Sequence, residues 1–373
     1  MKLPGFTRLL KRRAGELGFQ LTGVCPAVSP QGLSRFHDWL AAGYAGEMRY
    51  LIDRQAAYTH PRSVLDGVRS ILMLGMNYRS GESVAAEQSE GRVSCYAWGT
   101  IDYHDLIHER LKELVRWYHQ QDPGARLRGV VDTAPLLERE FAQLAGLGWV
   151  GKHTLLLNRQ QGSWFFLAAL LSDQLLEYDT PYESDYCGSC RACLDACPTA
   201  AFPEPYVLDA TRCISYLTIE LRDSVPAELR DGIDNWVFGC DVCQEVCPWN
   251  RAAPAAQESQ FAADSQQYPL DVVRLFDLDE AGFRQRFRKT PLWRSKRRGL
   301  LRNAAIVLGN RPSARGLDAL LKGLHDQEMI VRAAVAWALG RHRQVAATEA
   351  LRARLAEESE PAVRAEIQSS LGT

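Results

Sequence analysis

Eight of the ten cysteines of this chain lie between residues 187 and 247. The first four follow the pattern C-x2-C-x2-C-x3-C-P, and the last three follow C-x2-C-x3-C-P, with one further cysteine between them. This spacing lets the thiolates of one loop wrap an iron–sulfur cube, while the last cysteine of each run reaches the other cube. The pattern therefore predicts two [4Fe–4S] clusters, held by Cys187, Cys190, Cys193 and Cys247 and by Cys197, Cys213, Cys240 and Cys243.

Zinc is the alternative metal, because four thiolates also form structural zinc sites. The run that begins at Cys187 is denser than a zinc ribbon requires, which favours iron–sulfur clusters. Cys213 stands apart from a ferredoxin pattern, because 26 residues separate it from Cys240. Two adjacent clusters form a short wire for single electrons. Since long segments flank this wire, we expect it to feed a site in the N-terminal part of the chain.

The composition is that of an ordinary globular chain, with 46% hydrophobic and 24% charged residues and a formal net charge of −1. A length of 373 residues allows two or three domains. No run of apolar residues is long enough to predict a membrane span. Arg12-Arg13 could open an export signal, but Glu16 interrupts the apolar region that would have to follow. We expect a cytoplasmic protein whose first helix carries a solvated basic face.

Mixed apolar periodicity in the first 180 residues predicts a domain of either the α/β or the α+β class. Helical spacing is found in Phe6–Leu17, Leu106–His119 and Pro135–Ala145. Short apolar runs predict strands at 70–77, 128–132, 155–157 and 164–171. The predicted domains are 1–180, a ferredoxin-type two-cluster domain at 181–250, a linker with a helical extension at 251–290, and an all-α domain at 291–373.

The C-terminal domain contains an internal repeat. The segments Leu301–Gly309 and Val331–Gly340 match each other, and a third copy begins at Val363. Their arginines, Arg302, Arg332 and Arg364, are 30 and 32 residues apart. This period, with small residues on one helical face, predicts HEAT-like repeats; the alternative is an ordinary helical bundle.

Several segments of the chain resemble epoxyqueuosine reductases. The resemblance lies in the segments VDTAPLLER at 131–139, AGLGWVGKHTLL at 145–156, RCISYLT at 212–218, and YAWG with DYH between residues 96 and 104. The last segment has one extra residue before its aspartate, compared with the family pattern. The cysteine motifs and the terminal repeats follow in that family's order. The resemblance covers essentially the whole chain. It implies a cobalamin-dependent enzyme that reduces epoxyqueuosine to queuosine at the wobble base of tRNA, distantly related to reductive dehalogenases.

The resemblance implies that residues 1–180 form a cobalamin-binding catalytic domain. The chain has no D-x-H-x-x-G loop to supply a lower histidine ligand, which fits a base-off corrin. Asp132 is the implied proton donor, and we expect burial against the corrin to raise the pKa of its carboxyl. The alternative is a helix N-cap, with Asp132 or Thr133 capping a helix opened by Pro135.

Six further residues are candidates for corrin contacts: Cys95, Tyr103, Lys152, Leu156, Leu167 and Ser215. The resemblance implies that Cys95 and Tyr103 line the cobalt face, and a contact at Ser215 would place the corrin beside a cluster. The two leucines would form the floor of the corrin site, and Lys152 would contact a phosphate or a corrin side chain. Core packing is the alternative for the apolar candidates, for Cys95 and for Tyr103, and a solvated loop position is the alternative for Lys152. By default Cys25 is a small buried side chain.

Residues 283–302 carry nine lysines or arginines, no acid, and three interleaved aromatic rings. Positive charge beside aromatic rings suits RNA, through phosphate neutralisation and base stacking. A solvated basic face is the alternative. The residues expected to contact tRNA are Arg294, Lys296, Arg297, Arg298 and Arg302.

The expected partners are a tRNA with epoxyqueuosine in its anticodon loop and an external one-electron reductant of the flavodoxin or ferredoxin type. We expect a monomer that does not bind membranes. Two other functions stay open. One is a corrinoid reductase of a small molecule, similar to reductive dehalogenases. The other is a non-catalytic iron–sulfur adaptor that transfers electrons to a protein partner.

Overall fold

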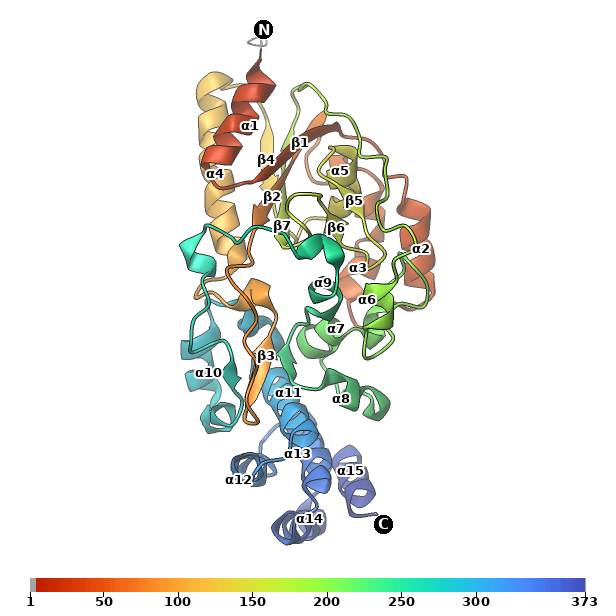
Figure 1. Ribbon diagram of the computed structural model, residues 1–373, viewed down its shortest axis with the longest axis vertical. Coiled ribbons are helices and arrows are strands. Elements are labelled where there is room, and N and C mark those ends of the chain that lie inside the picture. Colours follow the sequence, from red (N-terminus) through yellow and green to blue (C-terminus); the bar gives the residue numbers. More distant parts are fainter. Residues whose placement is uncertain (1–4, 373) are drawn as a thin grey trace.

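The computed structural model describes residues 5–372 and has a four-stranded sheet in the first half of the chain (Figure 1). The strand order is β1-β2-β7-β4, and every neighbouring pair is antiparallel. An antiparallel sheet of this kind belongs to the α+β class, which decides between the two classes predicted. The strands are β1 (Leu21–Pro26), β2 (Ser70–Asn77), β4 (Leu127–Val130) and β7 (Phe165–Ser172).

Helices cover both faces of this sheet. Leu72 of β2 packs in a core with α1 (Phe6–Glu16) and α4 (Tyr103–Gln121), which lie together on one side of the sheet in Figure 1. Its neighbour Ile71 packs in a second core with α5 (Glu138–Leu144) on the opposite side. Successive side chains of a strand point to opposite faces of the sheet. Because helices cover both faces, β2 is buried along its whole length, which explains why most of its residues are apolar.

The helices predicted at Phe6–Leu17 and Leu106–His119 are confirmed by α1 and α4, and the strand at 70–77 is confirmed by β2. The helix predicted from Pro135 begins only at Glu138. The preceding residues form tight turns instead, in which the N–H of Leu136 donates to the carbonyl of Ala134 and that of Glu138 to the carbonyl of Leu136.

A second sheet joins distant parts of the chain. Strand β3 (Glu90–Val93) pairs in parallel with β8 (Trp236–Phe238) and antiparallel with β9 (Leu270–Asp271). Three of the four predicted domains thus contribute a strand to one sheet. The segments on either side of residues 180 and 250 therefore pack against each other and are not independent structural units. The remaining short hairpin is β5 (Trp149–Val150) with β6 (Leu156–Leu157).

The cysteine segment folds into four short helices. Helix α6 contains Cys193 and helix α9 contains Cys243, and these two helices pack against each other. This contact brings the two cysteine motifs together, as the exchange of their last cysteines requires. The helices are α6 (Ala192–Asp195), α7 (Ile214–Ile219), α8 (Ala227–Ile233) and α9 (Val242–Glu245).

Helical repeats form the end of the molecule opposite the N-terminus (Figure 1). Helix α13 packs against α11 on one side and α15 on the other, as stacked repeats do. Among the described residues no helix is long and apolar enough to cross a membrane. The remaining helices are α2 (Leu33–Ala41), α3 (Arg49–Asp53), α10 (Glu280–Phe287), α11 (Lys296–Asn310), α12 (Ala314–Gly323), α13 (Met329–His342), α14 (Val345–Glu357) and α15 (Pro361–Leu371).

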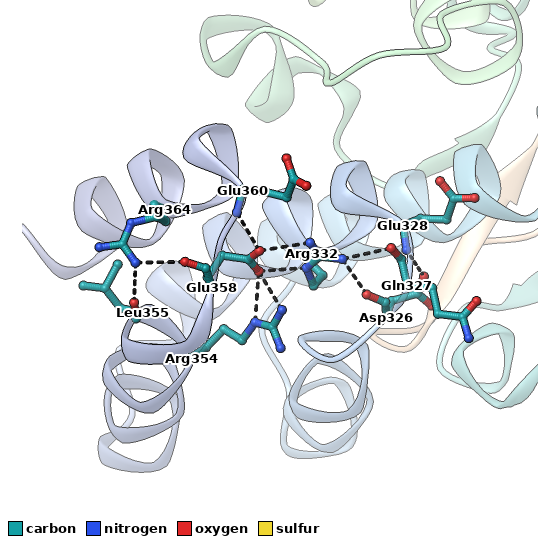
Figure 2. A network of polar contacts seen from close by, with 9 residues as sticks. All are labelled: Asp326, Gln327, Glu328, Arg332, Arg354, Leu355, Glu358, Glu360 and Arg364. Atoms are coloured by element: carbon teal, nitrogen blue, oxygen red, sulfur yellow. Dashed lines mark hydrogen bonds and ion pairs between the residues drawn. The ribbon is translucent and has the colours of Figure 1, made fainter.

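The repeated arginines join each helix pair to its neighbour. Figure 2 shows the network around Glu358, whose carboxylate accepts hydrogen bonds from Arg332 and Arg354. Arg332 also donates to the carbonyls of the loop before α13, and Arg364 donates to the carbonyl of Glu358. Inward-pointing arginines at the repeat period therefore stabilise the loops between helices.

Arg302 has the same role in the first repeat. Its side chain is 1% exposed, and its guanidinium donates to the carbonyls of Leu217, Leu221 and Asp223. The prediction that Arg302 contacts tRNA is wrong, because all of its charge is directed into the protein. These bonds attach the first repeat directly to α7 and to the loop that follows it.

Candidate active site

A cavity of about 480 Å³ opens where β2 ends and β7 begins, beside the cysteine helices. Segments far apart in the sequence line it, including the start of α4, the loop after β4, strand β6 and the start of α7. Five of the predicted site residues are brought together here: Tyr103, Asp132, Leu156, Leu167 and Ser215. The same cavity is lined by Cys197, Cys213, Cys240 and Cys243.

Aromatic side chains form one wall of the cavity. The rings of Tyr103 and Phe166 stack with 4.0 Å between their centroids and 9° between their planes. Tyr96 packs edge-on against both rings, and Tyr78 lies 4.7 Å from Phe166. These rings give a broad apolar surface with phenol groups at its margin, which suits a large flat ligand.

A second cavity, of about 250 Å³, is lined by Cys187, Cys190, Cys193 and Cys247. The two cavities divide the eight cysteines into the same two sets that the exchange pattern predicts. All ten cysteines are free thiols. Burial raises the pKa of Cys240 and Cys243 well above the usual value of a thiol. Each set is a four-sulfur donor set whose thiolates need a metal cluster to balance their charge.

Two predicted corrin contacts lie outside the first cavity. Cys95 is buried behind its wall, where its backbone N–H donates to Asp241. Lys152 extends in the other direction, and its ammonium donates to the carbonyls of Gly188 and Cys190 at 2.5 and 2.8 Å. Lys152 therefore fixes the first cysteine loop. The structure does not support either residue as a corrin contact.

Asp132 has an uncommon backbone conformation that aims its carboxylate at the cavity. Its φ angle is 54°, in the left-handed region that non-glycine residues seldom adopt. The hydroxyl of Tyr103 donates to Oδ2 at 2.9 Å, and Nε2 of His104 lies 3.2 Å from the same oxygen. The N-cap of α5 is Leu137, so the alternative role of Asp132 or Thr133 as a helix cap is wrong.

The expectation of a raised pKa at Asp132 is also wrong. Burial alone would raise the pKa, but the hydrogen bond and charge of His104, the charge of Arg294 and the hydrogen bond of Tyr103 outweigh it and lower the value to about 2. In His104, burial would lower the pKa, but the bonds to Asp102 and Asp132 prevail and raise it to about 9. At neutral pH the site therefore holds an aspartate beside a protonated histidine.

Glu138 is a second carboxyl at this site. Burial, followed by the charge of Asp132, raises its pKa to about 8. Its Oε1 accepts the backbone N–H of Asp132 at 3.0 Å, which fixes the loop in its left-handed turn. The two neighbouring carboxyls thus have opposite protonation states at neutral pH, a pattern found in acid–base sites.

Arg294 joins the C-terminal part of the chain to this site. Its guanidinium lies 2.9 Å from Glu220 and 3.6 Å from Asp132. This predicted RNA contact therefore reaches Asp132, while its side chain stays 41% exposed.

The other basic residues of the segment differ in exposure. Lys296 and Arg298 are exposed, and the ammonium of Lys296 lies 4.5 Å from the ring centroid of Trp293. Arg297 is 13% exposed and pairs with Asp326 at 2.5 Å. Lys296 and Arg298 are thus exposed at the surface, where Arg298 also lies 3.9 Å from Glu328. Most of the charge of Arg297 is neutralised within the protein.

Sequence reasoning missed several residues of this site. His104, Tyr96 and Glu138 all lie within the segments that carry the family resemblance, and this was a signal that could have singled them out. Phe166 and Glu220 lie in segments with no motif. Only the fold brings Phe166 to the cavity and Glu220 to Arg294.

An electron-transfer segment opening on a cavity with paired acid–base groups defines an iron–sulfur oxidoreductase. Family models match residues 59–133 (epoxyqueuosine reductase QueG), 186–250 (4Fe-4S double cluster binding domain) and 293–372 (HEAT repeats). The chain is 43% identical to the epoxyqueuosine reductase of Pseudomonas aeruginosa, over 88% of this chain and 92% of that one. It is 39% identical to that of Vibrio cholerae, over 93% and 94%. The chain belongs to the epoxyqueuosine reductase family.

Solved structures agree in fold over the full length. A crystal structure of epoxyqueuosine reductase with an epoxyqueuosine-modified tRNA-Tyr stem loop has a TM-score of 0.93 at 28% identity, covering 100% of this chain and 99% of the other. The enzyme from Bacillus subtilis, described with its catalytic aspartate loop swung out of the active site, has a TM-score of 0.91 at 27% identity with the same coverage.

Proposed function

We propose that this chain reduces epoxyqueuosine to queuosine at the wobble position of tRNA. Asp132 carries this proposal, because it places an acid–base group in a cavity bounded by an aromatic wall and four cysteines. The reaction breaks both C–O bonds of the epoxide, forms a C=C bond and releases the oxygen as water. It consumes two electrons and two protons, so it needs both an electron path and a proton path.

The electron path runs through the two cysteine sets. Each set supplies the four sulfurs that a [4Fe–4S] cluster needs, and α6 and α9 hold the sets next to each other. Cys190 in the outer set is exposed, whereas the inner set lines the main cavity. We infer that an external one-electron donor of the flavodoxin or ferredoxin type reduces the outer cluster first.

Cobalamin fits the main cavity. The aromatic wall of Tyr103 and Phe166 offers a flat apolar surface, Leu156 and Leu167 add apolar floor, and Ser215 lies beside the inner cysteine set. His153 also lines this cavity: it is buried, its Nδ1 accepts the N–H of Leu155, and its Nε2 has no hydrogen-bond partner among the described residues. When bound, cobalamin would supply a redox centre of low potential in the cavity that the inner cysteine set lines.

Asp132 is the proposed proton donor to the epoxide oxygen. Its carboxyl group is 45% exposed, which leaves one side open to the cavity while Tyr103 and His104 hold the other. Protonation of the oxygen as its C–O bonds break avoids release of an alkoxide, the task of a general acid. The wall of aromatic rings limits water around this proton transfer.

The tRNA is proposed to lie over the basic segment that precedes α11. Lys296 and Arg298 would neutralise backbone phosphates, while Arg294 faces both this surface and Asp132. An anticodon loop offers unstacked bases that a protein can draw into a pocket. We further propose that the protein acts as a monomer in the cytoplasm, where its tRNA substrate is found.

Turnover of a tRNA stem loop containing epoxyqueuosine tests the proposal. Protein with both clusters reconstituted is reduced chemically, with or without added cobalamin, and nucleosides are analysed by mass spectrometry. We expect about eight iron atoms per chain and queuosine only when cobalamin is present. Iron–sulfur absorbance with no cobalamin uptake and no queuosine would instead identify an electron-transfer adaptor. Turnover of small halogenated molecules but not of tRNA would identify a dehalogenase-like enzyme.

A further inference from the structure

We propose that His104 stores a proton for the reaction and passes it to the substrate through Asp132, with Asp102 holding the imidazole in place. His104 is therefore a positioning and relay residue, because it acts through Asp132. The inference rests on the proposed function. It adds to that function the source of the proton that Asp132 donates.

The three side chains form a chain of contacts. Oδ1 of Asp102 lies 2.6 Å from Nδ1 of His104, and Nε2 of His104 lies 3.2 Å from Oδ2 of Asp132. Asp102 is itself fixed, because the same oxygen accepts the backbone N–H of His104 and caps α4. The imidazole is therefore held between two carboxylates, with one nitrogen on each.

The proton count of the reaction requires such a store. Removal of the epoxide oxygen as water takes two protons, while the two electrons come from the external one-electron donor through the clusters. An aspartate carries one proton at most, and Asp132 is ionised at neutral pH because its pKa lies at about 2. In this scheme the proton on Nε2 of His104 moves to Oδ2 of Asp132 as negative charge develops on the substrate oxygen, and Asp132 passes it to that oxygen. Solvent supplies the other proton, which completes the water that leaves. Solvent restores the imidazolium after turnover.

The charges around His104 support a protonated ring. Asp102 and Asp132 face it directly, and the neutral form of Glu138 adds no negative charge at pH 7. The positive group nearby is Arg294, which contacts Asp132. His108, one turn along α4, is mostly neutral at pH 7, because burial and the charge of His104 lower its pKa below the ordinary 6.5. Against the charge of Arg294, the bonds to two carboxylates raise the pKa of His104 to about 9.

Kinetics of holoenzyme variants test the relay. We expect His104→Gln to lower kcat by roughly 100-fold with little change in KM for the tRNA stem loop, within the range of general acid catalysis. In the wild type, kcat should fall as pH rises through about 9, the value at which His104 loses its proton. This fall of kcat at high pH should disappear in His104→Gln. Added imidazole should restore turnover to His104→Ala. The matched control is His108→Gln, one turn along the same helix, which should keep the wild-type rate and profile.

Two results would overturn the relay: an unchanged kcat in His104→Gln, or a reduced kcat with the wild-type pH profile and no rescue by imidazole. Histidine NMR gives a readout independent of turnover. In the full chain with its clusters, the 15N signal of His104 should titrate near pH 9 and shift toward the ordinary 6.5 in Asp102→Asn. A wild-type titration near 6.5 would refute the relay even if the enzyme is active. A wild type that makes no queuosine but shows the high titration would contradict the proposed function alone.

Discussion

Two carboxylates in this molecule have their pKa lowered to about 2, and they serve opposite purposes. Burial would raise both values, but His104 and Arg294 prevail at Asp132, and Arg332 and Arg354 prevail at Glu358. Asp132 is 45% exposed to a cavity, and its nearest arginine nitrogen is 3.6 Å away. Glu358 is 1% exposed and accepts arginine hydrogen bonds as short as 2.8 Å (Figure 2).

The difference shows that the reactivity of a carboxylate depends on how completely its oxygens are occupied. The oxygens of Glu358 accept bonds from two arginines and from the backbone N–H of Glu360, so the group can only stabilise the loop that it joins. Asp132 keeps one side open and has a proton donor, His104, on the other. Ion pairing with arginine therefore stabilises a loop at Glu358, and it contributes to an acid–base group at Asp132.

The largest expected effect is on turnover, from Asp132→Asn. The amide keeps the size of the side chain but neither carries nor relays a proton. We expect kcat to fall by roughly 10²- to 10⁴-fold, about 3 to 5 kcal/mol in activation free energy. Steady-state rates of queuosine formation measure this loss. Iron content and cobalamin binding should match the wild type, and loss of either would mean that Asp132 has a structural role.

The next effect is on stability, from Glu358→Gln. This change leaves the guanidinium of Arg332, which is 9% exposed, without its counter-charge. Removing one partner of a buried pair costs about 3 to 5 kcal/mol, so the C-terminal helices should unfold at lower denaturant concentration. Denaturation followed by circular dichroism measures the change. Glu357→Gln, at the exposed neighbouring position, is the matched control and should have little effect.

The same pair predicts a pH dependence. The pKa of Glu358 in the folded protein, about 2, lies below its ordinary value of 4.5. Its stabilising contribution is therefore complete above pH 4.5 and is lost as pH falls toward 2. The stability difference between wild type and Glu358→Gln should shrink over this interval. A stability difference that stays constant down to pH 2 would contradict a stabilising role of the ionised Glu358.

A smaller effect is expected from Arg294→Ala, which removes the charge nearest Asp132 on the tRNA side. We expect kcat to fall by roughly tenfold, about 1.4 kcal/mol, because the exposed ion pair is partly screened by solvent. Rates measured at saturating tRNA separate this effect from weaker binding. An unchanged kcat with a raised KM would make Arg294 an RNA contact alone.

The smallest effect is expected at the exposed basic residues. The pair of changes Lys296→Ala and Arg298→Ala should weaken tRNA binding and reduce the slope of log affinity against log salt by up to about 2, or less for a single-stranded loop. Titration of labelled stem loop at several salt concentrations measures the slope. Lys112→Ala with Arg116→Ala removes two exposed charges from α4 and is the control. Equal slopes in both double variants would place the RNA elsewhere.

The sequence predicted the elements whose pattern is local. The apolar run of β2, the periodicity of α1 and α4, and the spacing of the cysteines each depend on near neighbours in the chain. The sequence also showed the repeat of Arg302, Arg332 and Arg364, but it did not show that these side chains bond to the loops between helices. A set of arginines at the repeat period indicated a common structural role, and this should have outweighed the high local charge around Arg302.

The remaining features depend on contacts between distant segments. The pairing of β3 with β8 and β9 has no local signal, so the sequence did not reveal that three of the predicted domains share one sheet. The pKa of Asp132 depends on Arg294, which lies 162 positions further along the chain. The sequence suggested only burial, which raises the pKa of Asp132. The contacts with His104, Arg294 and Tyr103 lower it instead.

The most direct test of the account compares the two carboxylates in paired measurements. Single-turnover formation of queuosine and the free energy of unfolding are determined for the wild type, Asp132→Asn and Glu358→Gln, each loaded with clusters and cobalamin. The account predicts that Asp132→Asn folds with wild-type stability and forms almost no queuosine, whereas Glu358→Gln is destabilised and turns over at nearly the wild-type rate while folded. Queuosine formation by Asp132→Asn at the wild-type rate would contradict the central claim.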